Sequence, residues 1–281
     1  MADTTWQRRL HALTGCRNVV LAGGSTLNSL ANGKIFANTP FENVFIPPAP
    51  DDAGCALGAA AYVHHHILGH PRSYAMTANS LGPRYDDAQI AEALASVGIK
   101  AERTDDPSRA AAELVAAGKV IGWFQGGLEF GDRALGNRSI LADPRDESMK
   151  ERVNALVKYR EGFRPFAPAI QAERVEEYSE GARPTPFMEK VFPIRADKRA
   201  VIPAVTHNDG TGRLQTVTEA QNPLFYRLIG AFGALTGVPV VMNTSFNVKG
   251  EPMVCSPQDA ISTFFTSGLD ALVMGNYVIR K

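Results

Sequence analysis

Apolar runs that end in glycines or small polar residues are the feature that most constrains the fold of this chain. Residues 120–124 and 238–242 read as buried strands, and the first leads into a glycine-rich loop while the second leads into Asn243 and Ser245. Helical patterns are found at 86–97, 107–117, 145–157, 222–236 and 257–267, and further strands are expected at 165–171, 187–194 and 213–217. This alternation predicts an α/β (α+β) fold, in which strand ends are the usual place for ligands.

A cluster of cations stands out because the chain as a whole is neutral. Lys+Arg and Asp+Glu both number 29, so the formal net charge is zero, which argues against a general binder of nucleic acid or anionic membranes. Five cations nevertheless fall close together beside glycines and aromatics: Arg133, Arg138, Lys158, Arg160 and Arg164. Such a group needs an anionic partner, and the glycines favour phosphate because they let the backbone come close to a ligand.

The spacing of these residues indicates how they could act together. Lys158, Arg160 and Arg164 are separated by even numbers of residues, so they would point to one face of an extended segment. A turn-rich segment at 206–213 ends in Arg213, and residues 243–251 follow a strand with a burst of hydroxyl and amide groups. The alternative is that each arginine pairs on the surface with an acidic side chain: Asp143, Asp146, Glu147 or Glu161. That alternative is favoured for any single arginine, whereas the recurrence at strand ends favours a binding site.

The first 70 residues differ from the rest of the chain in composition and are expected to form a separate unit. We expect a short amphipathic helix at 5–15, a buried strand at 18–22, a helix at 25–32, a strand at 43–46 and a Gly/Ala-rich helix at 53–68. Residues 71–84 are rich in turn-forming residues and are assigned as a linker. The predicted organisation is therefore 1–70, a linker at 71–84, and a larger domain at 85–281.

The cysteines and the N-terminus indicate the compartment. Cys16, Cys55 and Cys255 are far apart and odd in number, which fits free thiols in a reducing environment. The first ten residues are polar, and no stretch approaches the length of a membrane span. We therefore expect a cytoplasmic protein.

Four strings of residues resemble the O-carbamoyltransferases of antibiotic and nodulation-factor biosynthesis, the family that includes tobramycin carbamoyltransferase. The strings are 122–131, 133–145, 163–168 and 243–252, and the resemblance extends from Asn18 to the C-terminus. It implies that the domain at 85–281 is similar to the synthase that makes threonylcarbamoyl-adenylate. It also implies an enzyme that forms carbamoyl-adenylate from ATP and carbamoyl phosphate, with Mg²⁺ as counterion.

The same resemblance assigns roles to the cations and polar residues. It implies that Lys158, Arg164 and Arg213 hold phosphate and carbamoyl oxygens, that Arg133 helps on the same surface, and that Ser245 and Asn247 contact the nucleotide phosphates. These roles make chemical sense, because adenylation builds negative charge on transferring phosphates and depends on positioning and positive charge.

Residues 1–68 resemble the tail of the family's N-terminal domain, an actin/Hsp70-like transferase fold. The resemblance implies that Gly23, Gly24 and Asn28 contact the adenosine of carbamoyl-adenylate. It also implies that Asp52 binds a catalytic metal, Fe²⁺ or another divalent ion. Both assignments have a purely structural alternative: Asp52 could be a helix N-cap, and the glycine pair could form a tight strand–helix turn.

The family's upstream His-x-x-x-His metal motif is absent from this sequence. His64, His65, His66 and His70 lie elsewhere, where a helix end facing solvent is the favoured reading. One Asp cannot hold a catalytic metal alone, and about 70 residues cannot bury their own apolar face. We therefore expect half of a split enzyme, whose partner subunit supplies the rest of the transferase domain.

Smaller departures and rival functions complete the prediction. Asp132 stands where the family usually has proline, and Gly127 where a basic residue is common. The leading hypothesis is carbamoyl transfer to a hydroxyl or amine of a small natural-product acceptor, completed with the partner. The alternatives are a noncatalytic nucleotide-binding or stabilising subunit, and a tRNA threonylcarbamoylation factor. Direct binding of nucleic acid is not expected for a chain without net positive charge.

Overall fold

A mixed sheet of eight strands forms the centre of the protein in the computed structural model, which describes residues 4–159 and 164–281. The strands lie in the order β3 (Glu102–Arg103), β12 (Tyr277–Arg280), β11 (Ala271–Met274), β4 (Ile121–Phe124), β5 (Arg138–Ala142), β10 (Val240–Ser245), β6 (Ala167–Gln171) and β9 (Gln215–Val217). The pairs β11–β4 and β6–β9 are parallel, and the other neighbours are antiparallel. The predicted α/β class is confirmed.

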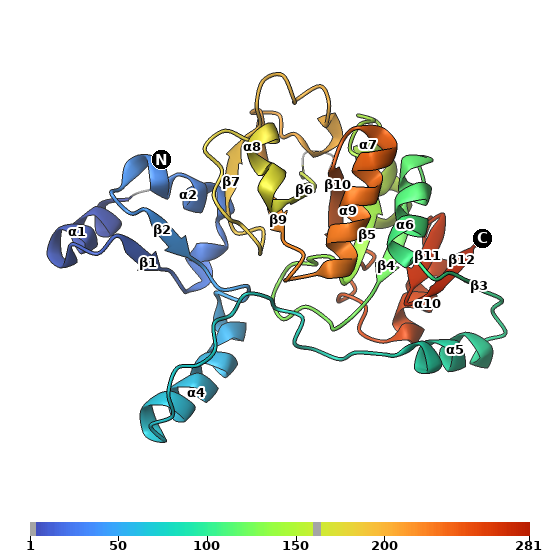
Figure 1. The fold of residues 1–281 in the computed structure, drawn as a ribbon, viewed down its shortest axis with the longest axis horizontal. Coiled ribbons are helices and arrows are strands. Elements are labelled where there is room, and N and C mark those ends of the chain that lie inside the picture. Colours follow the sequence, from blue (N-terminus) through green and yellow to red (C-terminus); the bar gives the residue numbers. More distant parts are fainter. Residues whose placement is uncertain (1–3, 160–163) are drawn as a thin grey trace.

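Two helices cover one face of this sheet. They are α6 (Pro107–Ala116) and α9 (Pro223–Thr236), and both begin with a proline that follows a capping residue, Asp106 or Asn222. Their apolar sides pack on inward-facing residues of β4, β5 and β11, with Trp123 wholly buried between the layers. Figure 1 shows both helices on the same side of the strands.

Three helices cover the opposite face. They are α5 (Asp87–Ser96), α7 (Met149–Val153) and α10 (Pro257–Thr266), and they share a second core cluster with Phe124, Ile140 and Met242. Capping boxes start α5 at Asp86 and α10 at Ser256. The result is a three-layer sandwich, with α8 (Val175–Tyr178) and the small antiparallel pair β7 (Val191–Pro193) and β8 (Thr211–Arg213) beside β6.

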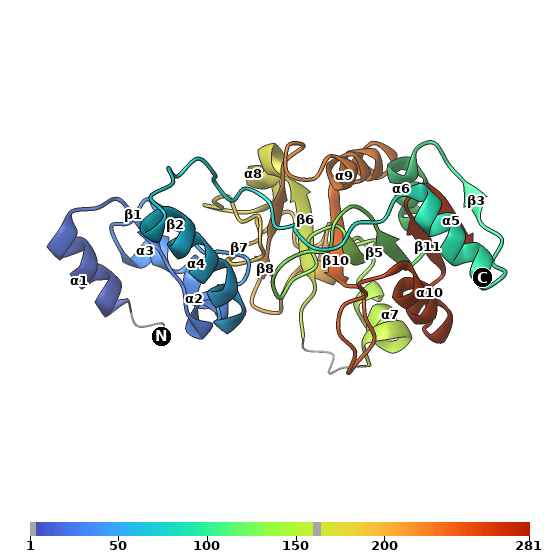
Figure 2. The ribbon, with the colours of Figure 1, turned by 90° about the horizontal axis from the view of Figure 1, so that it is seen from below.

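The N-terminal segment lies at one end of this sandwich. It contains α1 (Thr5–Thr14), β1 (Asn18–Val20), α2 (Ser29–Gly33), α3 (Ile35–Asn38), β2 (Asn43–Phe45) and α4 (Cys55–Tyr62). The segment is attached through α2, where the Asn32 amide donates to the Glu189 carbonyl at 2.9 Å, and Phe36 of α3 stacks on Phe192. Figures 1 and 2 show α1 and α4 extending away from the sandwich.

Much of the apolar surface of this segment is exposed. No residue of α1 or α4 is buried. The strand expected to be buried at 18–22 is shorter, and only Val19 is buried, while Val20 is 69% exposed. The expectation of a fully buried strand was therefore wrong, because β1 pairs only with β2 and nothing among the described residues covers its outer face.

Several boundaries differ from the sequence prediction. The helix expected at 145–157 begins at Met149 and ends in a π-helical turn, Asn154–Lys158. The strand expected at 187–194 is limited to β7, and strands β5, β11 and β12 were not predicted. Residues 69–86 contain no helix or strand, and the Asn79 side chain donates to the Phe130 carbonyl. Within the described part of the chain, none of the helices combines the length and apolar character needed to cross a bilayer.

Candidate functional site

Strand pairing gathers the predicted polar segments at one edge of the sheet. Ser245, the last residue of β10, pairs with Ser139 near the start of β5, and Asn243 pairs with Ala167 at the start of β6. The parallel partner of β6, β9, begins at Gln215 on the same edge. Arg138, Arg164, Arg213 and Ser245 therefore all belong to segments that begin or end at this edge, as polar strand ends had predicted.

Lys158 lies at the centre of this edge and contacts two other predicted residues. Its ammonium is 2.6 Å from the Ser245 carbonyl and 3.0 Å from the Ser245 hydroxyl. It is also 3.0 Å from the Asn247 carbonyl and 2.7 Å from the Asn247 side-chain oxygen. The structure thus brings together Lys158, Ser245 and Asn247, which are far apart in sequence.

The Lys158 cluster has a fixed geometry. Lys158 is only 6% exposed, and the Ser245 hydroxyl donates to the Asn247 side-chain oxygen at 2.7 Å. The Asn247 amide in turn donates to the Glu251 carbonyl. A positive charge is therefore held at a strand end among two main-chain carbonyls, a hydroxyl and a side-chain amide oxygen.

Lys158 does not lie in an extended segment, so the prediction of one face shared by even spacing was wrong. It ends the π-helical turn, and Tyr159 next to it adopts a left-handed conformation with φ 44°. Arg160 lies outside the described residues. Arg164 is exposed just before β6, and Arg213 is partly buried at the end of β8.

Arg138 occupies the protein interior instead of a ligand-facing surface. Its guanidinium lies 3.6 Å from the centre of the Phe124 ring and donates to the carbonyls of Gln125, Asn137 and Pro83 at 2.6, 3.1 and 3.2 Å. The side chain is fully buried, and burial lowers the pKa of Arg138 to about 10. Its position differs from the expected substrate contact, because main-chain carbonyls bond the two terminal nitrogens of its guanidinium, while Nε is buried without a hydrogen-bond partner among the described residues.

Glu129 organises the loop between β4 and β5. One oxygen of its carboxylate accepts hydrogen bonds from the main-chain N–H groups of Leu135, Asn137 and Arg138, at 2.7 to 3.2 Å. The other oxygen is buried and has no hydrogen-bond partner among the described residues. Burial raises the pKa of Glu129, although these three hydrogen bonds act in the opposite direction.

Arg133 faces the junction with the N-terminal segment. It lines a cavity with Thr26, Leu27, Pro47, Pro48, Pro50, Asp132, Phe187, Met188 and Glu189. The loop approaches closely here, because a Cβ on Gly131 would lie 2.3 Å from the Pro48 carbonyl. Burial raises the pKa of Asp132, and the negative charge of Asp51 raises it further. Arg133 is therefore placed between the sheet edge and the turn that contains Gly23 and Gly24.

The N-terminal candidates have local structural roles. Gly23 has φ 106°, which a side chain would disfavour, and Asn28 caps α2 by accepting from the Ala31 N–H at 3.1 Å. Asp52 is exposed in a short 3-10 turn. The suggestion that Asp52 is the N-cap was wrong, because the neighbouring Asp51 accepts the hydrogen bond from Ala53.

A metal site is not formed by the described part of the chain. Across residues 4–159 and 164–281, no three His, Cys, Asp or Glu side chains converge as ligands. His64 and His70 stack on each other at 4.4 Å on an exposed helix end. Asp52 could supply only one ligand, so a metal at this position would need further ligands from elsewhere.

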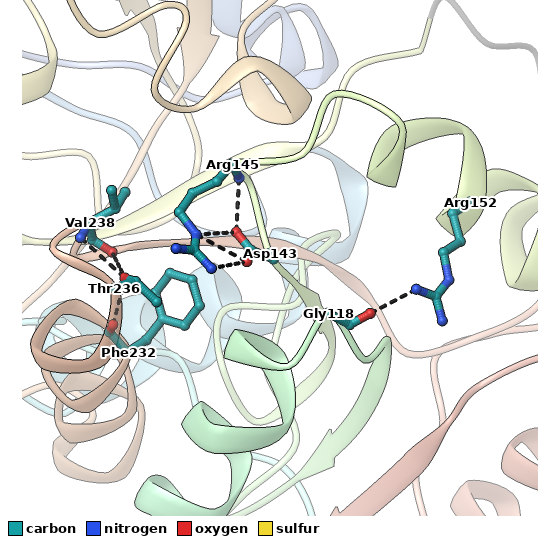
Figure 3. Close-up of polar contacts among 7 residues, drawn as sticks. All are labelled: Gly118, Asp143, Arg145, Arg152, Phe232, Thr236 and Val238. Atoms are coloured by element: carbon teal, nitrogen blue, oxygen red, sulfur yellow. Dashed lines mark hydrogen bonds and ion pairs between the residues drawn. The ribbon is translucent and has the colours of Figure 1, made fainter.

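At the opposite edge of the sheet, two arginines make contacts that are purely structural. Arg145 follows β5 and forms a two-pronged ion pair with Asp143, at 3.0 and 2.6 Å (Figure 3). Its guanidinium lies 5.6 Å from the Phe232 ring of α9. Arg152 binds the Gly118 carbonyl and the carboxylate of Asp270. Arg145 and Arg152 are thus arginines with acidic partners, whereas the contacts of Lys158 with Ser245 and Asn247 are to neutral oxygens.

Two buried amides at the edge had no role in the sequence prediction, in which Asn243 only began a polar segment and Gln215 was not singled out. Asn243 and Gln215 are buried within β10 and β9, and the Asn243 amide donates to the Gln215 side-chain oxygen at 2.7 Å. The available signal was an amide inside an otherwise apolar strand, because such a group requires a partner when it is buried.

Comparison with known proteins identifies related sequences. Residues 112–281 match the profile described as Carbamoyltransferase C-terminus, and residues 6–61 match Carbamoyltransferase N-terminus. The nodulation protein NolNO of Sinorhizobium fredii is 46% identical over 96% of this chain and 40% of its own length. The nodulation protein NolO of Bradyrhizobium diazoefficiens is 46% identical over 95% of this chain and 50% of its own length.

A third relative has a name that specifies a reaction. The 3'-hydroxymethylcephem-O-carbamoyltransferase of Amycolatopsis lactamdurans is 31% identical over 91% of this chain and 47% of its own length. The chain thus spans about half the length of these curated relatives. Among solved structures, Sua5 of P. abyssi bound to L-threonine has a TM-score of 0.45 at 18% identity, covering 63% of this chain and 49% of that one.

Proposed function

This chain belongs to the carbamoyltransferase family, and on that premise we propose that it forms carbamoyl-adenylate from ATP and carbamoyl phosphate. In the overall reaction, water releases carbamate and phosphate from carbamoyl phosphate. A carbamate oxygen then bonds to the α-phosphorus of ATP, and the bond to the β-phosphate breaks. The products are carbamoyl-adenylate, pyrophosphate and phosphate.

The contact of Lys158 with Ser245 and Asn247 carries this proposal. A buried ammonium with a hydroxyl and an amide at a strand end can hold phosphate oxygens as charge shifts from the α-phosphorus to the leaving pyrophosphate. Arg164 and Arg213 belong to segments that meet the same edge, and their guanidinium groups suit carbamoyl or phosphate oxygens. Binding of the acid and nucleotide oxygens in fixed positions is what these residues would contribute.

Two metals enter the proposal with different support. We place Mg²⁺ with ATP, where it would neutralise phosphate charge, and assign it no protein ligand. Fe²⁺ or another divalent ion would require Asp52 together with residues from a second polypeptide, because the described residues do not form a metal site by themselves. No step is assigned to either ion.

Transfer of the carbamoyl group is proposed to need a partner subunit. The described N-terminal segment leaves Val20, Tyr62 and Ile67 more than half exposed, and its sheet has only two strands. Such a sheet is marginal by itself, and parallel sheets are normally covered on both faces. The name of the cephem carbamoyltransferase supports a hydroxyl of a small molecule as the acceptor, with an amine as the other option.

Carbamoyl-phosphate-dependent exchange of pyrophosphate into ATP tests the adenylation step. We expect exchange by the wild-type chain, and a loss of about 100-fold or more in Lys158→Ala and Arg164→Ala, because each removes positive charge from the site. Arg109→Ala is the matched control, since Arg109 is exposed on α6 and pairs with Glu113. Thermal melting would verify that each variant is folded.

The noncatalytic alternative makes the opposite prediction. A stabilising subunit would show no exchange in wild type, either alone or with a partner present. That result would overturn the adenylation proposal, even if ATP still bound. A tRNA-modification factor is the weaker alternative, because the chain carries no net positive charge to attract a phosphate backbone.

A further inference from the structure

Two buried amides connect three separate segments at the sheet edge. The Asn243 amide donates to the Gln215 side-chain oxygen at 2.7 Å and to the Ala134 carbonyl at 3.2 Å. The Gln215 amide donates to the Leu135 carbonyl at 2.8 Å. Together Asn243 and Gln215 form an amide bridge that fastens the loop at 134–135 to strands β9 and β10.

Each end of the amide bridge is next to a residue of the proposed site. Asn243 is two residues before Ser245, and Gln215 is two residues after Arg213, so along extended chain each pair returns to the same face. The third end, Ala134, directly follows Arg133. The bridge therefore lies one or two residues from three groups proposed to handle phosphate and carbamoyl oxygens.

The buried amide groups of the bridge are less favourable for the stability of the folded protein than apolar side chains would be. Asn243 is 1% exposed and Gln215 is 3% exposed, and the side-chain oxygen of Asn243 has no hydrogen-bond partner among the described residues. A buried acceptor without a donor is unfavourable, whereas Leu or Met could fill such positions with apolar contacts. Groups of this kind are explained better by the geometry they enforce than by the stability they add.

We propose that Asn243 and Gln215 are positioning residues that set the place of Arg133 relative to Ser245 and Arg213. The inference rests on the proposed function, since it concerns the same phosphate-handling edge. The bridge acts through the loop: when it is intact, Ala134 and Leu135, which directly follow Arg133, are tied to β10 and β9. When it is broken, the loop at 131–137 keeps its hydrogen bonds to Glu129, and Gly136 keeps those with Trp123 of β4 and Ser139 of β5. Residues 134–135 lose their attachment to β9 and β10.

Three variants test the bridge against a matched control. Gln215→Met and Asn243→Leu remove the hydrogen bonds with little change in size, and the double variant removes both ends. Gln171→Met is the control, because Gln171 is a buried glutamine on the neighbouring strand β6 that donates to the Tyr226 carbonyl instead. Hydrogen exchange of residues 131–137, the melting temperature, and the Kd for ATP are measured for each.

The expected result separates positioning from general stability. Gln215→Met and Asn243→Leu should weaken ATP binding about 10-fold and raise exchange in 131–137, with little change in melting temperature. The double variant should lose no more than the worse single one, because both changes break the same bridge. Gln171→Met should leave ATP binding and loop exchange as in wild type.

Other outcomes contradict the bridge or the proposed function separately. One such outcome is ATP binding within twofold of wild type in both single variants while Lys158→Ala weakens it. That result would overturn the positioning role of the amide bridge and leave the proposed function standing. If Lys158→Ala also had no effect, the proposed function would fail. If the wild type bound no ATP, hydrogen exchange of residues 131–137 would test the positioning role of the amide bridge. Unchanged exchange in Gln215→Met would overturn that role, and raised exchange would support it.

Discussion

Two buried cations near the sheet edge differ in their surroundings, although each of them contacts main-chain carbonyls. Arg138 is enclosed by main-chain carbonyls and the Phe124 ring, so its charge holds the protein together. Lys158 contacts the carbonyls of Ser245 and Asn247, and it also contacts the Ser245 hydroxyl and the Asn247 side-chain oxygen, the two side chains that we propose contact phosphate. Both residues were predicted to bind substrate from the same local composition, because sequence alone cannot show which cation lies under the loop.

His207 provides a test of burial at the scale of one side chain. Its Nδ1 lies 3.0 Å from the Thr211 hydroxyl, which donates to Asp209, and its Nε2 is buried without a hydrogen-bond partner among the described residues. Burial lowers the pKa of His207 below its usual 6.5, opposed by Asp209 and assisted by Arg213 and Lys150. The folded protein therefore disfavours the protonated imidazole.

The sign of the pH effect follows from this lowered pKa. Above pH 6.5 the imidazole is neutral in both states, and the stability associated with it is fully present. As the pH falls through the lower pKa of the folded state, that stability is lost. Urea denaturation from pH 7.5 to 5 should therefore show a smaller loss of stability in His207→Gln than in wild type. Equal losses in the two proteins would contradict this account of His207.

At the scale of elements, the apolar strands and capped helices could be predicted from the sequence, whereas features that depend on contacts between distant segments could not. Helices α6, α9 and α10 match the sequence prediction because each has a capping residue, a proline at its start and a regular apolar face. Strand β5 was missed because glycines and arginines on its N-terminal side resemble a loop. The site was only partly predictable, since Asn243 and Gln215 have meaning only once β9 and β10 meet across β6.

The attachment of α2 to β7 gives a prediction for one glycine contact. A Cβ on Gly33 would lie 1.9 Å from the Val191 carbonyl, and main-chain atoms cannot move aside cheaply. Gly33→Ala should therefore cost about 1–3 kcal/mol in the free energy of unfolding and expose the N-terminal segment to limited proteolysis. Urea denaturation and protease digestion measure both effects.

Gly58 is the matched control for this contact. It lies in α4, and a Cβ there would meet no atom within 4 Å. Gly58→Ala should leave the attachment intact and should add up to about 1 kcal/mol of helix stability. If Gly33→Ala were as stable and as protease-resistant as Gly58→Ala, the α2–β7 contact would not be what holds the segment in place.

At the scale of the whole molecule, the exposed apolar surface and the proposed adenylation residues lie on different parts of the chain. The proposed adenylation residues belong to the sandwich, whereas Trp6, Leu13, Val20 and Ile67 are all more than 60% exposed in the N-terminal segment. Trp6, Leu10 and Leu13 recur at helical spacing on α1, as the packed face of an amphipathic helix does. Exposed apolar faces this extensive usually mark an interaction surface.

We predict that a partner subunit binds to this exposed apolar surface of the N-terminal segment. Because this chain spans 40% of the length of NolNO, the NolNO region outside the match is the probe. We expect it to co-purify with the wild-type chain when the two are co-expressed. Val20→Asp should reduce the complex about 10-fold or more, because it puts a charge on the outer face of β1. Leu235→Asp is the control, since Leu235 is 52% exposed on α9, far from the segment.

The adenylation assay keeps this result separate from the proposed chemistry. Val20→Asp should retain pyrophosphate exchange while losing the partner, and Lys158→Ala should retain the partner while losing exchange. A wild-type chain that stays monodisperse beside the probe and transfers carbamoyl groups alone would contradict the need for a partner. A dimer of this chain, disrupted by Val20→Asp and indifferent to the probe, would assign the surface to a second copy instead.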